Sequence, residues 1–383
     1  MAAGIAPLGA SGLGRLFRDR GSDQSCLPTG GITRPASDDS HVDRLQPGGP
    51  SLECDATVVL GDTLTEYYAS PTAAYAWTTA WNDDAPSPHS VLYRIPFDGT
   101  PVSAIGVVGR PPDHLAFFED AHEHLNVVVA HANETVTLLR LPLSWFADGS
   151  TDAPAFSYRT LTTGYWVIAR FVGPYLLAGT STENPDDPNG RRVVVTAWEG
   201  TSTVLLKLPH TVERIEPMGA HAVVVGTDDD SLLMTAIRLT SRPTVADTLA
   251  LKGSSQAEYR SHAFVYRQDT RDDGVFGLPV DVTTGDDNNR WDRPARIVFI
   301  QNRGLTFLRA GTLSPSSGKP VDDHCRASCV DWYGNARPIF LDGRTFALSG
   351  YELVEGRFVD GRVKNVGRLD FKPSDEGVLH PTH

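Results

Sequence analysis

The chain has 383 residues, of which 21% are charged and 40% belong to the apolar set. This composition is typical of a folded globular protein with a sizeable core. Lys and Arg number 34 and Asp and Glu number 47, so the net charge is −13. Such an acidic balance argues against binding to a nucleic-acid backbone, which needs a basic face. The sequence contains no run of about 20 apolar residues, so no transmembrane segment is predicted.

The first 50 residues are rich in Gly, Ser, Pro and Asp and poor in large apolar side chains. We expect a flexible tail over residues 1–50, a folded body over 51–371 and a second tail over 372–383. The start of the chain lacks a basic segment followed by a continuous apolar one, so an export signal is not visible.

From residue 52 onward, short runs of Val, Ile, Leu, Thr and aromatic residues recur between Gly, Pro, Asn and Asp, which is the pattern of β-strands. Representative runs are 56–60, 125–131, 175–180, 221–227 and 295–301. Many are apolar on consecutive residues, which indicates strands that are covered on both faces. Stacked propeller blades cover their strands in this way, and so do the inner layers of a complex sandwich.

The runs fall into six units, with seven possible if the fifth unit hides an extra half-blade. The units are 52–111, 112–164, 165–210, 211–253, 254–320 and 321–371. Each has about the length of a four-stranded propeller blade. We therefore predict an all-β fold: a β-propeller of six to seven four-stranded antiparallel blades, because closing the ring leaves only short, protected edges.

The second unit contains a concentration of histidines and acids. His114, His122, His124 and His131 lie within 18 residues of one another, close to Glu119, Asp120 and Glu123. In a strand His122 and His124 point to the same face, which suggests a metal chelate. The alternative is a polar hairpin turn over 119–124.

Several loops are acidic, and the one over 284–292 is the best candidate for calcium. Asp286, Asp287 and Asp292 supply hard oxygen ligands there, together with two asparagines. The segment lacks the ligand spacing of an EF-hand, and solvated turn residues are the competing interpretation.

Four cysteines are present, an even and low number that is compatible with disulfides in an oxidising compartment. A local bridge between Cys325 and Cys329 is sterically reasonable, and Cys26 is a candidate to tether the N-terminal tail to Cys54. A zinc site has less support, because only His324 lies near Cys325 and Cys329. Free thiols are the remaining alternative.

The last unit shows the turn chemistry most clearly. Asp342-Gly343 and Asp360-Gly361 separate short apolar runs, and such pairs favour type I′ hairpin turns. The runs 339–341, 345–348, 351–353, 357–359 and 363–366 predict up to five strands. Among these residues we expect a core built of Phe340, Phe346, Leu348 and Leu353.

No catalytic residues are predicted, because the sequence has neither a G-x-S-x-G elbow nor the context of a thiol protease. The seven tryptophans pack between blades or line a sugar-binding mouth; they are Trp77, Trp81, Trp145, Trp166, Trp198, Trp291 and Trp332.

Several segments, in order, resemble the prokaryotic secreted proteins that carry a C-terminal β-propeller domain. They read YYASPTAAYAW (67–77), LYRIPFDG (92–99), GVVGRPPDHLAFFEDAHEHLNVVVAH (106–131), SHAFVYRQDTRDDGVFGLPVDV (261–282) and ARPIFLDGRTFALSGYEL (336–353). The acidic opening of that family is absent here. The resemblance implies a propeller outside the cell or on the surface of a prokaryote, and it supplies no catalytic residues.

Together these observations predict a non-catalytic binding or scaffolding module for an unknown protein or glycan ligand. We expect a monomer with no nucleic-acid partner and no cofactor other than possible calcium. The alternative is a propeller enzyme that acts on an extracellular polysaccharide or another polymer.

Overall fold

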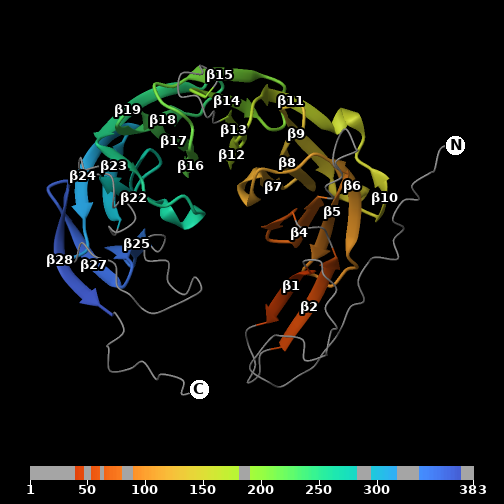
Figure 1. The fold of residues 1–383 in the computed structure, drawn as a ribbon, viewed down its shortest axis with the longest axis horizontal. Helices are drawn as coiled ribbons and strands as arrows, with labels where there is room; N and C mark the ends of the chain where they lie inside the picture. The colour runs from red at the N-terminus through yellow and green to blue at the C-terminus, as the bar shows by residue number, and fades with distance from the viewer. Residues whose placement is uncertain are drawn as a thin grey trace, which may run out of the picture. The chain divides into compact units, whose positions relative to one another are not determined.

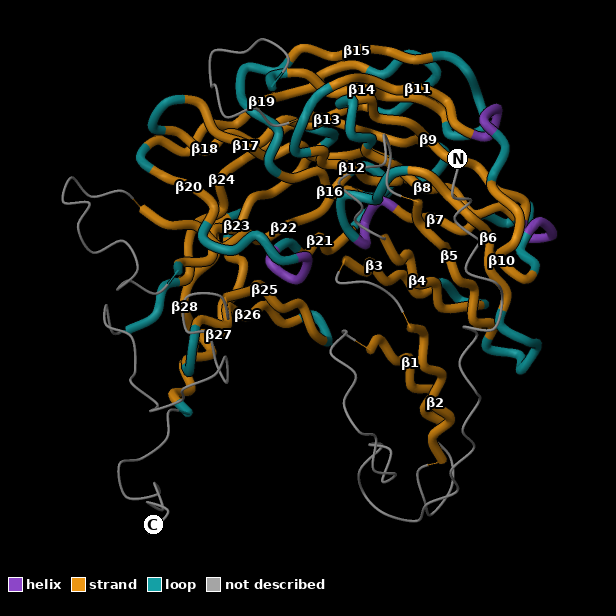
Figure 2. The backbone as a smooth tube through the Cα atoms, turned by 45° about the vertical axis from the view of Figure 1, so that its right-hand side comes forward, coloured by secondary structure: helices purple, strands orange, loops and turns teal. Residues whose placement is uncertain are grey.

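The computed structural model describes residues 39–46, 53–60, 64–79, 89–180, 190–282, 295–316 and 336–371. It contains two compact units, residues 1–171 and 172–383. Within the described part of the chain the regular structure is β-strand, interrupted by single 3-10 turns of three residues each (Figure 2). No helix among these residues is long and apolar enough to cross a membrane.

The first unit holds two sheets, which we call sheet 1 and sheet 2, and one separate strand pair (Figure 1). The separate pair is β1 (Asp39–Gln46) with β2 (Glu53–Leu60). Sheet 1 comprises β3 (Leu64–Ala69), β4 (Ala73–Thr79), β5 (His89–Pro96), β6 (Ser103–Val108) and, parallel to β6, β10 (Asp148–Asp152). Sheet 2 comprises β7 (Phe117–Glu119), β8 (His124–Ala130), β9 (Thr135–Pro142) and β11 (Tyr158–Thr163).

Four more sheets follow in chain order, and the boundary between the units falls within β12. Sheet 3 comprises β12 (Val167–Val172), β13 (Tyr175–Thr180), β14 (Arg192–Ala197) and β15 (Thr203–Lys207). Sheet 4 comprises β16 (Arg214–Met218), β17 (His221–Asp228), β18 (Ser231–Arg238) and β19 (Thr244–Lys252).

The last two sheets are sheet 5 and sheet 6. Sheet 5 comprises β20 (Ser254–Gln256), β21 (Val265–Gln268), β22 (Asp273–Val282), β23 (Arg296–Arg303) and β24 (Thr306–Leu313). Sheet 6 comprises β25 (Ala336–Leu341), β26 (Arg344–Ser349), β27 (Glu352–Val359) and β28 (Arg362–Asp370). Each of the six sheets lies within one of the six predicted sequence units, apart from β10, which follows the second unit's β9 but joins sheet 1. The predicted blade architecture of a β-propeller is therefore confirmed.

Burial differs between the strands of one sheet, and the last strand in the chain is more exposed than the second. The second strand of sheet 4, β17, is buried over six consecutive residues, whereas its fourth strand, β19, is mostly exposed or half-buried. β4 is buried along its whole length, and β28 is almost entirely exposed. Consecutive apolar residues therefore mark strands that are covered on both faces, as the sequence predicted.

Apolar side chains fill the space between neighbouring sheets of the second unit. Phe276 of sheet 5 lies 5.1 Å from Phe264 and 5.4 Å from Phe307, measured between ring centroids, in a cluster that includes Met218 and Val223 of sheet 4. Sheets 5 and 6 approach so closely that a Cβ atom on Gly277 would lie 2.4 Å from Cβ of Pro338.

Both predicted type I′ turns of sheet 6 are present. Asp342 and Gly343 have φ of 48° and 74°, and Asp360 and Gly361 have φ of 50° and 74°. The strand prediction needs one correction. The runs 351–353 and 357–359 fall, apart from Tyr351, in a single strand, β27, because the register shift at Glu355/Gly356 is a bulge and not a break.

The predicted core of sheet 6 is only partly buried. Phe346 is 9% exposed, while Phe340, Leu348 and Leu353 are half-buried. Phe340 faces Phe299 of sheet 5 at 6.0 Å between ring centroids. The other three lie on the opposite face of sheet 6, where the Arg344 guanidinium covers the Phe346 ring at 4.7 Å.

Replacing Gly343 with Val should lower the free energy of unfolding by about 1–2 kcal/mol, because a β-branched residue resists positive φ. No heavy atom lies within 4 Å of a Cβ built there, so the loss comes from the backbone alone. Gly367→Val is the matched control: it has no positive φ, and its Cβ would be in ordinary contact with Glu355. Urea titration of both variants measures the difference. An equal loss in the two would contradict the turn assignment.

Phe346→Ala should lower the free energy of unfolding by about 3 kcal/mol through lost burial and a residual cavity. Arg344→Ala should change it little, because the Arg344–Glu355 pair is exposed to solvent. Chemical denaturation followed by tryptophan fluorescence tests both. A neutral Phe346→Ala variant would show that this face of sheet 6 is not part of a core.

Candidate functional site

The turn between β7 and β8 carries the acidic and histidine residues that the sequence singled out. β7 ends at Glu119, and the Asp120 amide donates to the His124 carbonyl at 2.9 Å. Glu123 closes the turn with φ of 59°. The hairpin-turn interpretation of residues 119–124 is therefore correct, and His122 lies in the turn and not on a strand.

Glu119 joins sheet 2 to sheet 1. Its Oε2 accepts hydrogen bonds from Ser70 Oγ at 2.7 Å and from Tyr75 Oη at 2.5 Å. Its Oε1 accepts one from Thr72 Oγ1 at 2.5 Å. Three hydroxyl groups of sheet 1 and the turn that precedes β4 thus surround one carboxylate, which satisfies most of its acceptor capacity.

Tyr75 is the fully buried member of this group. Burial raises its pKa well above the usual value, and the hydrogen bond to Glu119 raises it further. Arg94 Nε donates to the phenol oxygen at 3.3 Å. A phenol that is buried and held in its neutral form is a poor nucleophile, so this tyrosine–glutamate pair serves packing between sheets and not covalent chemistry.

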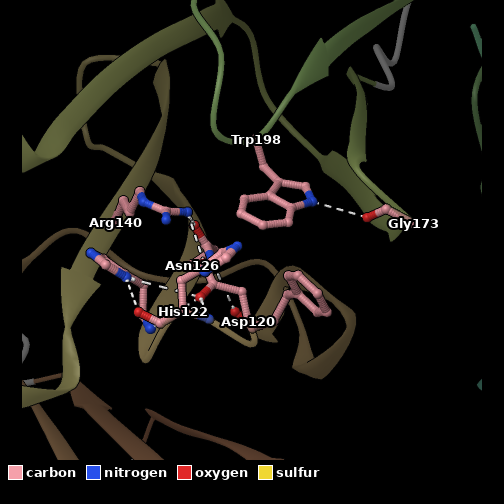
Figure 3. Close-up of polar contacts among 8 residues, drawn as sticks. Asp120, His122, Asn126, Arg140, Gly173 and Trp198 are labelled. Atoms are coloured by element: carbon pink, nitrogen blue, oxygen red, sulfur yellow. Dashed lines mark hydrogen bonds and ion pairs between the residues drawn. The ribbon is translucent and has the colours of Figure 1, made fainter.

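Asp120 forms a second cluster within sheet 2 (Figure 3). Its Oδ2 accepts from Arg140 Nη1 at 2.8 Å and from Asn126 Nδ2 at 2.9 Å. Its Oδ1 accepts from the amides of His122 and His124 at 2.8 and 3.2 Å. Burial alone raises the pKa of Asp120, but these donors outweigh it and hold the pKa below its usual range. The carboxylate shapes the turn and stays charged.

The four histidines do not come together as a metal site. His124 Nδ1 is paired with the His122 carbonyl at 2.7 Å and lies 3.9 Å from Asp120. His131 lies in the β8–β9 turn, at the other end of β8, where Nε2 is 2.8 Å from Thr137 Oγ1. His114 lies in the 3-10 turn before β7. Among the residues that the structure describes, no group of three or more His, Cys, Asp or Glu is placed to hold a metal ion.

The calcium candidates Asp286, Asp287 and Asp292 lie outside the described residues, and so do Cys325 and Cys329. Two other acidic loops can be placed, and in each a carboxylate lies beside a basic side chain. Asp228 Oδ1 lies 2.7 Å from Arg191 Nη2, and Asp272 Oδ1 lies 3.3 Å from His221 Nε2.

A buried ionic network in the second unit was not predicted. Arg214 of β16 donates to Glu216 Oε1 at 2.9 Å, to Gln256 Oε1 at 2.9 Å and to the carbonyls of Glu258 and Arg260. It ties the first strand of sheet 4 to the entry into sheet 5. The alternation of Arg and Glu in RIEPM (214–218) reads as a solvated strand face, so the sequence gives no signal that both charges are buried.

The tryptophans divide into buried and exposed groups. Trp77 is fully buried, and Trp198 Nε1 in the second unit donates to the Gly173 carbonyl at 2.9 Å (Figure 3). Trp166 is 68% exposed. Trp145 is half-buried against Phe156, with 6.0 Å between ring centroids. Trp81, Trp291 and Trp332 lie outside the described residues.

Exposed aromatic rings flank β11, the last strand of sheet 2 in the chain, at both of its ends. Phe156 precedes β11 and is 81% exposed; Tyr165 and Trp166 follow β11 and are 63% and 68% exposed. Trp166 also has φ of 46°, a left-handed conformation that is an outlier for a bulky residue. A strained, exposed aromatic residue on an otherwise well-packed sheet points to a binding role.

Asp120→Asn should lower the free energy of unfolding by about 2 kcal/mol at neutral pH, because half-buried Arg140 loses its charged partner, the buried Asp120 carboxylate. The folded pKa is depressed, so the contribution of Asp120 is complete above the unfolded value of about 3.9 and is lost as pH falls through the folded value. Urea titrations from pH 7 to pH 2.5 should show the two proteins converging at low pH. Asp360→Asn, at an exposed hairpin tip, is the control. A stability gap between wild type and Asp120→Asn that is constant with pH would contradict a charged Asp120.

No protein-family model matches the chain, and no curated protein sequence matches it. Similar solved structures include the WD40 domain of coronin from Toxoplasma gondii, with a TM-score of 0.42, 12% identity, and coverage of 80% of this chain and 70% of that one. Hsv2 from Kluyveromyces marxianus has a TM-score of 0.43, 10% identity, and coverage of 80% and 98%. Apo AztD from Citrobacter koseri has a TM-score of 0.43, 8% identity, and coverage of 86% and 80%. These are β-propeller folds, the class to which the six sheets assign this chain.

Proposed function

We propose that the chain is a non-catalytic binding module that acts outside a prokaryotic cell and holds its ligand on the segments that flank β11 of sheet 2. The observation that carries the proposal is the set of aromatic rings exposed on those segments, Phe156, Tyr165 and Trp166. Loops that are positioned by a rigid sheet are common sites of binding, and Trp and Tyr are enriched among residues that dominate binding energy.

The location outside the cell is supported by the sequence resemblance to secreted prokaryotic propeller proteins. The acidic net charge of −13 is compatible with solubility and disfavours polyanionic ligands.

The hydrogen bonds and ion pairs of the carboxylates favour a binding role over an enzymatic one. A glycosidase needs carboxyl groups that reach the scissile bond. Glu119 and Asp120 are instead enclosed by donors from their own chain, and Glu216 and Glu258 are buried in the ionic network of the second unit. Each of these groups already has a structural task.

Full-length protein mixed with isolated bacterial cell envelopes should bind saturably and release no new reducing ends. The double variant Phe156→Ala/Trp166→Ala should lose at least nine-tenths of the binding without a change in unfolding midpoint. Leu205→Ala, which removes an exposed apolar side chain of sheet 3, should bind as wild type does. Release of reducing ends by wild type would favour the polysaccharide enzyme, and full binding by the double variant would contradict the assigned surface.

A further inference from the structure

We propose that Trp166, Tyr165 and the β8–β9 turn form a subsite for one sugar ring of a neutral glycan. The inference deepens the proposed function and depends on it, because it names the ligand class of a non-catalytic binding module. Tyr165 and Trp166 follow the last residue of β11, Thr163, which pairs with Thr135 at the start of β9. The two aromatic residues therefore lie beside the turn formed by residues 131–134.

The platform is fixed before any ligand arrives. The Gly164 amide donates to the Glu134 carbonyl at 2.8 Å, and the Glu134 amide donates to the His131 carbonyl at 3.0 Å. The Tyr165 phenol donates to Glu134 Oε1 at 2.5 Å. These bonds fix Glu134, which has φ of 64°, and tie Gly164 and Tyr165 to it; Trp166 follows directly with φ of 46°. A preorganised loop loses less conformational entropy when a ligand binds.

The chemical groups at this place match a pyranose ring. The Trp166 side chain is 68% exposed and supplies an apolar, flat surface for the C–H face of a sugar. Glu134 Oε2 has no hydrogen-bond partner among the described residues, so it is available to accept from a sugar hydroxyl. The Asn133 side chain uses Oδ1 to accept the Thr135 amide, which leaves its NH₂ group as a donor. Sugar hydroxyls both donate and accept, so they complement both the Glu134 oxygen and the Asn133 amide.

Charge and size favour a neutral glycan over other ligands. The chain carries a net charge of −13, and the only charged side chain of the subsite, Glu134, is an acid. Both features oppose uronate-rich and sulfated polymers. A specific protein partner needs roughly 800 Å² on each side with an apolar centre. Two exposed aromatic rings beside a polar turn match the size and polarity of a sugar ring better than those of a protein interface.

The alternative that the Trp166 indole packs between blades can be tested by its effect on stability. If the indole served packing, its removal would destabilise the fold. Because Trp166 is exposed and has positive φ, Trp166→Gly should keep or raise the unfolding midpoint while it removes binding. A midpoint that falls by several degrees would overturn the assignment of Trp166 to a ligand.

Isothermal titration calorimetry of the full-length protein with hexasaccharides of glucose, mannose, galactose and N-acetylglucosamine tests the ligand class. We expect saturable binding of at least one of them. Trp166→Ala should weaken that binding at least tenfold, Trp166→Phe should restore part of it, and Glu134→Gln should weaken it about threefold. Leu205→Ala, which removes an exposed apolar side chain of sheet 3, is the control and should leave the affinity unchanged.

The outcomes separate this inference from the proposed function. If the protein binds cell envelopes but none of the hexasaccharides, and if periodate treatment of the envelopes leaves binding intact while protease removes it, the ligand is a protein and the glycan inference is overturned. Loss of oligosaccharide binding in Phe156→Ala but not in Trp166→Ala would also overturn the subsite. If wild type does not bind envelopes at all, the proposed function fails as well.

Discussion

The side chains of β4, β8 and β17 are buried on both faces of their sheets, and this double burial governs the rest of the molecule. A strand with two covered faces needs an apolar neighbour on each side, so the chain repeats one blade after another. Dispersion contacts across the sheet–sheet spaces, such as those around Phe276, are individually small and collectively large. The strand that ends each sheet is released from this constraint, and β19 and β28 are accordingly exposed.

The same constraint explains why polar side chains between sheets have hydrogen-bond partners. A polar group that enters the space between two sheets must find partners there, because burying it without them costs several kcal/mol. Glu119 obtains hydroxyl donors from sheet 1, and Arg214 obtains acceptors from the segment that enters sheet 5. Glu119 and Arg214 thus help to specify how neighbouring sheets meet within each unit. Groups free to meet a ligand are found instead where the chain leaves a strand.

Strand content, blade size and turn type could be predicted from the sequence because they depend on local patterns. The Asp-Gly pairs fix positive φ at Asp342 and Asp360, and runs such as 221–227 reveal double burial without any knowledge of their neighbours. The single strand β27 was divided in two because a glycine within a strand looks like a break, although Gly356 marks a bulge that lets Leu313 and Val363 approach. The parallel pairing of β10 with sheet 1 is set by non-local contacts that no window of sequence contains.

The candidate site was less predictable for a related reason. The histidines around Asp120 attract attention by their number, but their roles depend on which partners the fold supplies, and Asp120 turns out to organise its own turn. Trp166 was one of seven tryptophans in the sequence, and only exposure and positive φ distinguish it from Trp77. Both properties belong to the three-dimensional structure.

The most direct test of this account is an NMR spectrum of the indole N–H groups of the seven tryptophans, recorded with and without a neutral hexasaccharide. Trp166→Phe assigns the relevant signal by its disappearance. We predict that the ligand shifts the Trp166 signal and leaves that of the buried Trp77 in place. A shift confined to other tryptophans, or equal shifts of all of them, would contradict it.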